Sequence, residues 1–133
     1  MFRNALILAG LAQLGIAASS VFIPRLLGWR EETSRLKPLT RQVFWTYAGY
    51  ILCFHIAFGL LSLLAPASLL DGSLLARAVC GFIAVYWLVR LTLQFAVFDR
   101  SVAAGRPLFR FGEAAYVSTF AYLVLVYGAT AVR

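Results

Sequence analysis

The chain has 133 residues, of which 62% are hydrophobic and 13% are charged, and its mean hydropathy is +0.86. Soluble domains average about half apolar and about a quarter charged residues, so this composition excludes an ordinary water-soluble fold and favours a lipid bilayer as the solvent. The net charge is +7, but the basic residues lie mostly between apolar runs, which is typical of topology determinants and lipid-headgroup contacts. We therefore expect no nucleic-acid partner.

Four apolar runs cover most of the chain, at residues 5–23, 43–65, 74–98 and 114–132. Each reaches the roughly 20 residues that a helix needs to cross about 30 Å of hydrocarbon. The sequence therefore predicts an all-α, polytopic membrane protein with a single domain over residues 1–133. Because the connections are short, an up-down-up-down bundle of four transmembrane helices is the simplest topology.

The ends of these runs carry residues typical of helix boundaries. Pro24 closes the first run and Pro66 the second. Ser73 is placed to cap the third run, and Glu113 stands at the start of the fourth, where a helix N-terminus favours negative charge. The first run follows Arg3 and ends in small residues, as a secretory signal does, but we count it as a membrane span.

The first connection mixes apolar and basic residues from residue 23 onward. This mixture predicts a short helix in the plane of the lipid headgroups, anchored by Trp29; a plain hydrophilic loop is the alternative. In the third connection, Phe109 and Phe111 flank Arg110 and predict a similar interfacial arrangement.

Basic residues are divided unevenly between the two sides that the four runs define. The positive-inside rule places the more basic side in the cytoplasm. We therefore predict a multi-pass protein of the bacterial inner membrane with both termini outside the cytoplasm. Eight cations on one side face three on the other: Arg25, Arg30, Arg35, Lys37, Arg41, Arg100, Arg106 and Arg110 against Arg3, Arg77 and Arg133.

Arg90 lies inside the third run, where a charge requires either a partner or a route to the interface. Trp87 and Gln94 share its helical face, and Tyr47 belongs to a group of polar residues at a similar depth. These four side chains are candidates for a site that binds a lipid phosphate or another small anion. The alternatives are a structural hydrogen bond or ion pair with a neighbouring helix, and an intersubunit contact.

His55, the single histidine, lies near the middle of the second run. One histidine nitrogen suffices as an axial ligand, so His55 is a candidate ligand of haem or of a chlorophyll-type pigment. The alternative is a neutral, hydrogen-bonded core residue, and Gly59 and Ser62 on the same face indicate close helix packing. Small residues at Gly15/Ser19 and Ala114/Ser118 also predict close approaches of helix backbones.

The residues that membrane enzymes and transporters require are missing from the sequence. None of the five acidic residues lies at mid-span, where proton-coupled exporters of this size need a carboxylate. The sequence has no Ser/His/Asp set, paired carboxylates, phosphate-binding glycine loop, histidine cluster or CxxC. Cys53 and Cys80 lie in apolar runs, and we expect both to be buried. We therefore expect neither an enzyme nor a metal site.

Three segments, RLKPLTRQVFWTYAGYI from Arg35, LVRL from Leu88 and FAVFD from Phe95, resemble uncharacterised four-helix membrane proteins of bacteria. The resemblance covers about half of the chain and includes no catalytic motif. It implies a four-helix inner-membrane protein and assigns no role.

The favoured function is an accessory or scaffolding subunit of a larger bacterial membrane complex. Its partners would be membrane lipids and other membrane subunits, or a second copy of the chain. Phe95, Phe98 and Phe120 are candidates for the partner interface, because aromatic residues are enriched at interface hot spots; a lipid-facing aromatic belt is the alternative. Two further functions stay open: lipid or anion handling at Arg90, and haem or pigment binding at His55.

Overall fold

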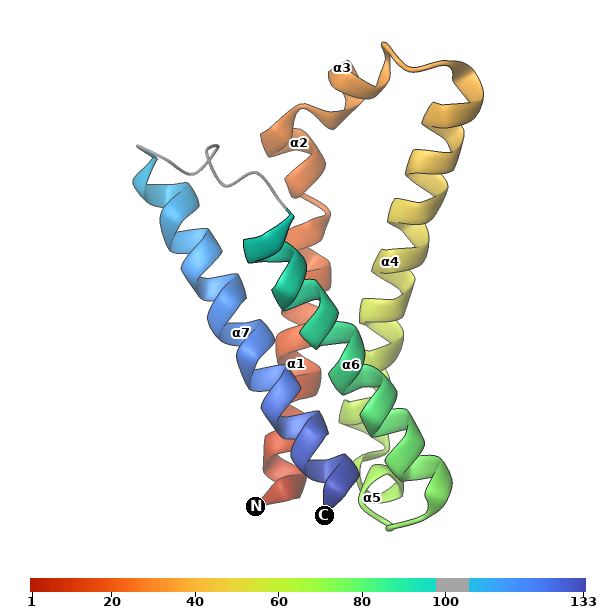
Figure 1. Cartoon of the computed structure of the whole chain (residues 1–133), viewed down its shortest axis with the longest axis vertical. Coiled ribbons are helices and arrows are strands. Elements are labelled where there is room, and N and C mark those ends of the chain that lie inside the picture. Colours follow the sequence, from red (N-terminus) through yellow and green to blue (C-terminus); the bar gives the residue numbers. More distant parts are fainter. Residues whose placement is uncertain (98–105) are drawn as a thin grey trace.

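Four long helices run up, down, up and down through the computed structural model of the chain (Figure 1). They are α1 (Phe2–Ser20), α4 (Pro38–Leu64), α6 (Leu74–Ala96) and α7 (Pro107–Val132). All four are long and apolar enough to cross a membrane. The predicted all-α bundle of four membrane spans is confirmed. The structure describes residues 1–97 and 106–133.

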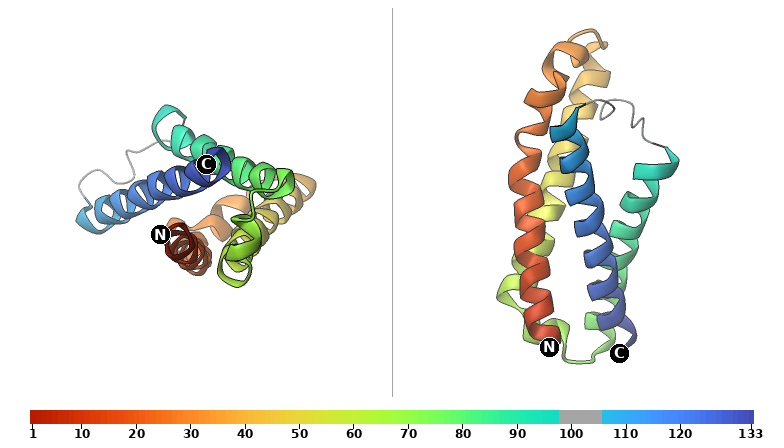
Figure 2. Two further views of the ribbon diagram at one scale, coloured as in Figure 1. Left: turned by 90° about the horizontal axis from the view of Figure 1, so that it is seen from below. Right: turned by 90° about the vertical axis from the view of Figure 1, so that its left-hand side faces the viewer.

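The helices pack as two pairs, α1 with α4 and α6 with α7, and α1 also contacts α7 (Figure 2). The buried core draws side chains from all four long helices. Its largest fully buried members are Trp87 and Tyr127. Both termini lie at the same end of the bundle (Figure 1), as an even number of spans requires.

A close backbone approach joins α1 to α4 at Gly10 and Gly59. A Cβ atom on Gly10 would lie 2.8 Å from the carbonyl oxygen of Gly59, and one on Gly59 would lie 2.8 Å from Cγ of Leu14. A Cβ atom on Gly15 would meet no atom within 4 Å. The prediction of a close approach at Gly15 is therefore wrong, because that residue points away from the neighbouring helices.

Two helices begin earlier than their hydropathy predicts. α4 begins at Pro38 and α7 at Pro107, since the fixed φ of proline suits the first helical position. The early start places Phe109, Arg110 and Phe111 in the first turns of α7 rather than in a separate interfacial helix. It also places Glu113 beyond the first turn of α7.

The first connection is helical, as its mixed composition predicts, but it forms two short helices instead of one. They are α2 (Ile23–Leu27) and α3 (Trp29–Thr33), joined at Gly28, whose φ of 67° is in the left-handed region. The ring of Trp29 lies 5.3 Å from that of Phe44 and 6.3 Å from that of Trp45. The anchor residue therefore packs on the first turns of α4 and fixes the α2–α3 bridge across one end of the bundle.

The second connection contains α5 (Pro66–Leu69) and a tight turn at Gly72, where φ is 78°. The backbone N–H of Ser73 donates to Asp71 at 2.8 Å, and this hydrogen bond lowers the pKa of the Asp71 carboxyl. Ser73 Oγ accepts from the N–H of Ala76 at 3.1 Å. The predicted cap of the third span is confirmed.

At the end of the bundle where the termini lie, two arginines form hydrogen bonds with backbone carbonyls of other segments. Arg77 Nε donates to the carbonyl of Ala131 at 3.0 Å, and an Arg133 N–H donates to the carbonyl of Leu70 at 3.0 Å. Each guanidinium thus satisfies a carbonyl that lies outside or at the end of a helix, where no intrahelical donor reaches it.

Candidate functional site

A buried polar network joins all four spans at the centre of the bundle. Trp87 Nε1 donates to Gln13 Oε1 at 3.0 Å, and Gln13 Nε2 donates to the Tyr127 hydroxyl at 2.6 Å. The Tyr127 hydroxyl also pairs with the hydroxyl of Ser62. Gln13 Nε2 makes a second contact with the carbonyl of Ala9 at 3.3 Å.

Every polar side-chain atom of this network is engaged within the protein. Gln13, Ser62, Trp87 and Tyr127 are all fully buried. A buried polar atom without a partner in hydrocarbon costs several kcal/mol, and here the spans satisfy one another. The network therefore fixes the register of four helices, and its atoms are committed to one another rather than to a substrate.

His55 lies beside this network, in a nest of aromatic rings. Its Nε2 lies 2.8 Å from the Tyr86 hydroxyl, and its ring centroid lies 4.9 Å from that of Trp87. Nδ1 is buried and has no hydrogen-bond partner among the described residues. Haem or pigment ligation through Nε2 requires the Tyr86 hydroxyl to be displaced and the adjacent rings to move. The geometry favours a core histidine over an axial ligand.

Arg90 belongs to α6, is partly buried, and extends its side chain towards α7. One guanidinium N–H donates to Gln94 Oε1 at 3.2 Å, and the guanidinium carbon lies 5.0 Å from the centre of the Phe120 ring. Cation–π contact and hydrogen bonding both stabilise a charge that would otherwise be exposed to lipid. Arg90 thus has partners within the protein, which favours a structural role.

The structure separates the four residues predicted to form an anion site. Arg90 and Gln94 are together, but Trp87 points its indole N–H at Gln13. Tyr47 lies on α4 with 62% of its surface exposed. Tyr47 is thus largely exposed on α4, and Trp87 is engaged in the central network, so Arg90 and Gln94 are the two candidate residues that share a hydrogen bond.

The three predicted interface aromatics also have different environments. Phe95 is 53% exposed, at the end of α6. Phe120 is only 3% exposed, because it stacks between Trp87 and Tyr116; its placement on the outer surface was a wrong prediction. Phe98 lies outside the described residues.

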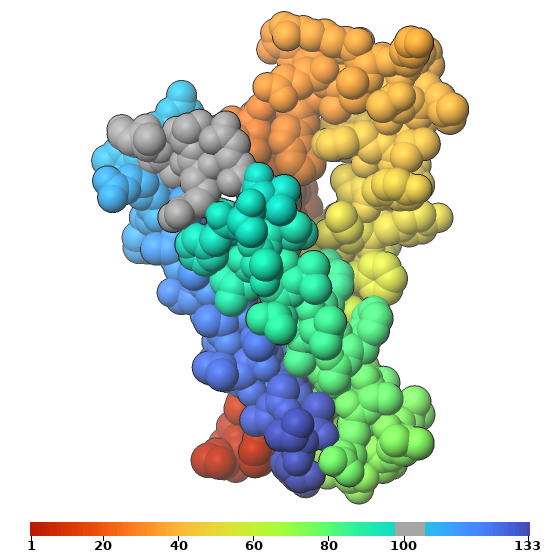
Figure 3. All heavy atoms as spheres, in the orientation of Figure 1, coloured from red at the N-terminus to blue at the C-terminus, as the bar shows by residue number. Residues whose placement is uncertain are grey.

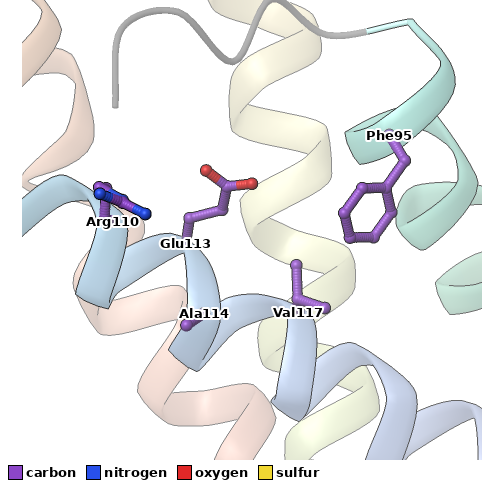
Figure 4. Close-up of a pocket in the computed structure, with 5 residues that line it drawn as sticks. All are labelled: Phe95, Arg110, Glu113, Ala114 and Val117. Carbon is purple, nitrogen blue, oxygen red and sulfur yellow. The ribbon is translucent and has the colours of Figure 1, made fainter. Parts of the chain in front are cut away.

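Phe95 lines an open pocket between the end of α6 and the first turns of α7 (Figure 4). Its volume is about 260 Å³, and the other lining residues are Arg110, Glu113, Ala114 and Val117. Pockets that enclose drug-sized ligands have volumes of about 300–1,000 Å³. The small volume and the open shape make this pocket a poor candidate for a substrate site.

A surface that the sequence did not single out lies on the upper half of α4. Tyr47, Tyr50 and Phe54 follow one another at spacings of three and four residues, so they share one helical face. Their exposed fractions are 62%, 60% and 48%. We call these three residues the aromatic ridge. The tyrosines themselves were visible in the sequence, but their common orientation depends on how α4 leans away from α6.

Metal-ligating residues do not cluster in the part of the chain that the structure describes: no group of three His, Cys, Asp or Glu side chains is placed to hold an ion. Cys80 is buried as predicted, whereas Cys53 is exposed on α4, contrary to prediction.

Comparison with protein-family models, with curated proteins and with solved structures finds no match to this chain. The resemblance to bacterial four-helix membrane proteins therefore rests on the sequence segments alone.

Proposed function

We propose that this chain is a non-catalytic accessory or scaffolding subunit of a larger complex in the bacterial inner membrane. In this proposal the aromatic ridge on α4 receives a transmembrane helix of another subunit. The two alternatives have weaker support, since the side chains of Arg90 and His55 already contact other groups inside the bundle.

The proposal rests mainly on the hydroxyl groups of the aromatic ridge, which have no partner inside the described part of the bundle. Neither Tyr47 nor Tyr50 makes a side-chain hydrogen bond with any described residue. Measured from Val43, where the apolar run begins, they lie about 6 Å and about 10 Å along the helix. A hydroxyl left without a partner in hydrocarbon costs several kcal/mol, so a neighbouring helix with an acceptor at this depth would stabilise both.

The ring surfaces support the same conclusion. Tyrosine and phenylalanine bring large contact areas at low cost in conformational entropy, and tyrosine is enriched at interface hot spots. Polar contacts between spans add specificity to such packing. A partner helix with serine, threonine or asparagine facing Tyr50 fits the ridge best.

To test the proposal, two variants and the wild type are purified from native membranes in a mild detergent, and the proteins that co-purify with each are compared. Replacing both Tyr47 and Tyr50 by leucine keeps the surface apolar, and the co-purifying partner should be lost while membrane insertion stays normal. Tyr50→Phe removes one hydroxyl and should weaken the partner's retention. Mass spectrometry of the purified material measures both effects.

Phe111→Leu is the matched control, because Phe111 is an aromatic residue that is 74% exposed on α7. It should retain the partner fully. A photo-crosslinking residue at position 50 should capture the same partner, and one at position 111 should not. If the wild-type protein runs alone and monodisperse from native membranes, the subunit proposal is wrong.

The proposed orientation, with both termini outside the cytoplasm, predicts the outcome of reporter fusions at Arg133. A reporter active only in the periplasm should be active, and one active only in the cytoplasm should be inactive. The physical reason is the excess of cations in the first and third connections. The reverse pattern would invert the orientation and leave the bundle itself unaffected.

A further inference from the structure

One helical face of α4, whose residues recur at spacings of three and four, is buried in the bundle along only its lower half. The members of this face are residues 41, 44, 48, 51, 55, 58 and 62. His55, Phe58 and Ser62 at the lower end are buried in the bundle.

Below the contact of Phe44 with Trp29, the upper half of the same face is not buried. No residue of α4 from 38 to 54 is buried, and Ile51 on this face is 50% exposed. Figure 3 shows the surface hollowed between the upper part of α4 and α6, beneath α2 and α3. We call this hollow the α4 groove. Ala48 and Ile51 share the helical face of the buried His55, so helical periodicity assigns them to the α4 side of the groove.

Four cations belong to the upper end of α4 and to the connection that precedes it. Arg41 belongs to the groove face, one turn above Phe44, and is partly buried. Arg25, Arg30 and Lys37 lie on the bridge formed by α2, α3 and the residues that follow. Among the described residues, none of these four cations has a side-chain hydrogen bond or ion pair; Arg35 is the cation that pairs, with Glu31 at 4.0 Å.

We propose that the α4 groove binds one anionic phospholipid, with an acyl chain along Ala48 and Ile51 and the phosphate on Arg41. An apolar slot beneath unpaired cations complements a negatively charged headgroup that carries a hydrocarbon chain. The depth also fits a lipid. From Arg41 to Ile51 the helix rises about 15 Å, which is half of the roughly 30 Å hydrocarbon core.

A transmembrane helix fits this groove less well than a lipid does. Such a helix needs about 30 Å of free length, but the α2–α3 bridge crosses the upper end (Figure 1) and His55 and Phe58 fill the lower end. A lipid occupies a single leaflet and needs neither end open. The groove and the aromatic ridge lie on different faces of α4, so this proposal does not depend on the docking proposal.

The experiment reconstitutes the full chain in nanodiscs of equal parts phosphatidylglycerol and phosphatidylcholine, and native mass spectrometry counts the lipids that stay bound. The wild type should retain one phosphatidylglycerol. Arg41→Gln should lower its affinity about five-fold, the equivalent of about 1 kcal/mol for one cation near a headgroup. Ala48→Trp should fill the α4 groove and abolish retention of any lipid.

Two matched controls distinguish a specific lipid site from general attraction between cations and anionic lipids. Arg35→Gln removes the same charge from the same connection, but from a cation paired with Glu31. Ala57→Trp adds the same volume on an exposed position of α4 outside the groove face. Both should retain phosphatidylglycerol as the wild type does. Equal losses in Arg35→Gln and Arg41→Gln, or full retention in Ala48→Trp, would overturn the proposal. Retention of phosphatidylcholine in place of phosphatidylglycerol would overturn it equally.

Discussion

Replacing Gly10 by leucine should lower the free energy of unfolding by about 1–3 kcal/mol, the usual cost of overpacking a close contact. A Cβ atom at this position meets the backbone oxygen of Gly59 at 2.8 Å, the backbone nitrogen of Leu63 at 3.1 Å and Cβ of Ser62 at 3.2 Å. Two of these three atoms belong to the backbone of α4, which cannot rotate aside as a side chain can. The two helices must therefore separate, and thermal melting in detergent measures the loss.

Gly15→Leu on the same helix is the matched control. A Cβ atom there meets nothing within 4 Å, and leucine favours a helix over glycine by several tenths of a kcal/mol. This variant should equal or slightly exceed the wild type in melting temperature. Equal destabilisation by both substitutions would mean that the cost arises from leucine in α1 generally, and that α1 and α4 do not cross at Gly10.

The contrast between these two glycines indicates what the sequence could predict. Four spans were predictable because the hydropathy of about 20 successive residues is a local property, and the Ser73 cap was predictable because it involves only the next turn. A close helix crossing is not local. Gly15 and Gly10 are equally small, and only the position of Gly59 on another helix makes one of them a contact.

The same distinction applies to the candidate site. Phe120 was predicted at the partner interface because aromatic residues are enriched there, but its direction depends on the rotation of α7 against α6. Tyr127 gave no signal as a network residue, since a tyrosine in an apolar run also suits a lipid interface. Ser62 was predicted to face a neighbouring helix, and the structure supplies that neighbour as Tyr127.

The helix starts at Pro38 and Pro107 were missed for a related reason. Hydropathy marks the part of a helix that lies in lipid, whereas the first turns of α4 and α7 are polar enough to lie at the interface. Proline at the first position marks the start of the helix itself. A search for proline upstream of each apolar run would have placed both starts.

Removing the glutamine at the centre of the polar network should have an effect of similar size to that of Gly10→Leu. Gln13→Leu preserves most of the volume but leaves the indole N–H of Trp87 without an acceptor and deprives the Tyr127 hydroxyl of a donor. Interhelical hydrogen bonds in membrane proteins contribute about 0.6 kcal/mol each on average and up to about 1.7 kcal/mol. Two such bonds are lost here, so we expect a loss of about 1–3 kcal/mol in the free energy of unfolding. Gln42→Leu is the control. Gln42 is exposed, so its replacement should leave the free energy of unfolding unchanged.

A double-mutant cycle with Trp87→Phe tests whether the cost comes from the hydrogen bond or from packing. Phenylalanine removes the indole N–H, so Gln13→Leu should be less costly in the Trp87→Phe background than in the wild type. The expected coupling between the two substitutions is about 0.6–1.7 kcal/mol. Additive effects would mean that Gln13 and Trp87 contribute separately. In that case the hydrogen bond from Trp87 would not couple α1 to α6, and the polar link between the two helix pairs would depend on the contacts of Tyr127 with Gln13 and Ser62.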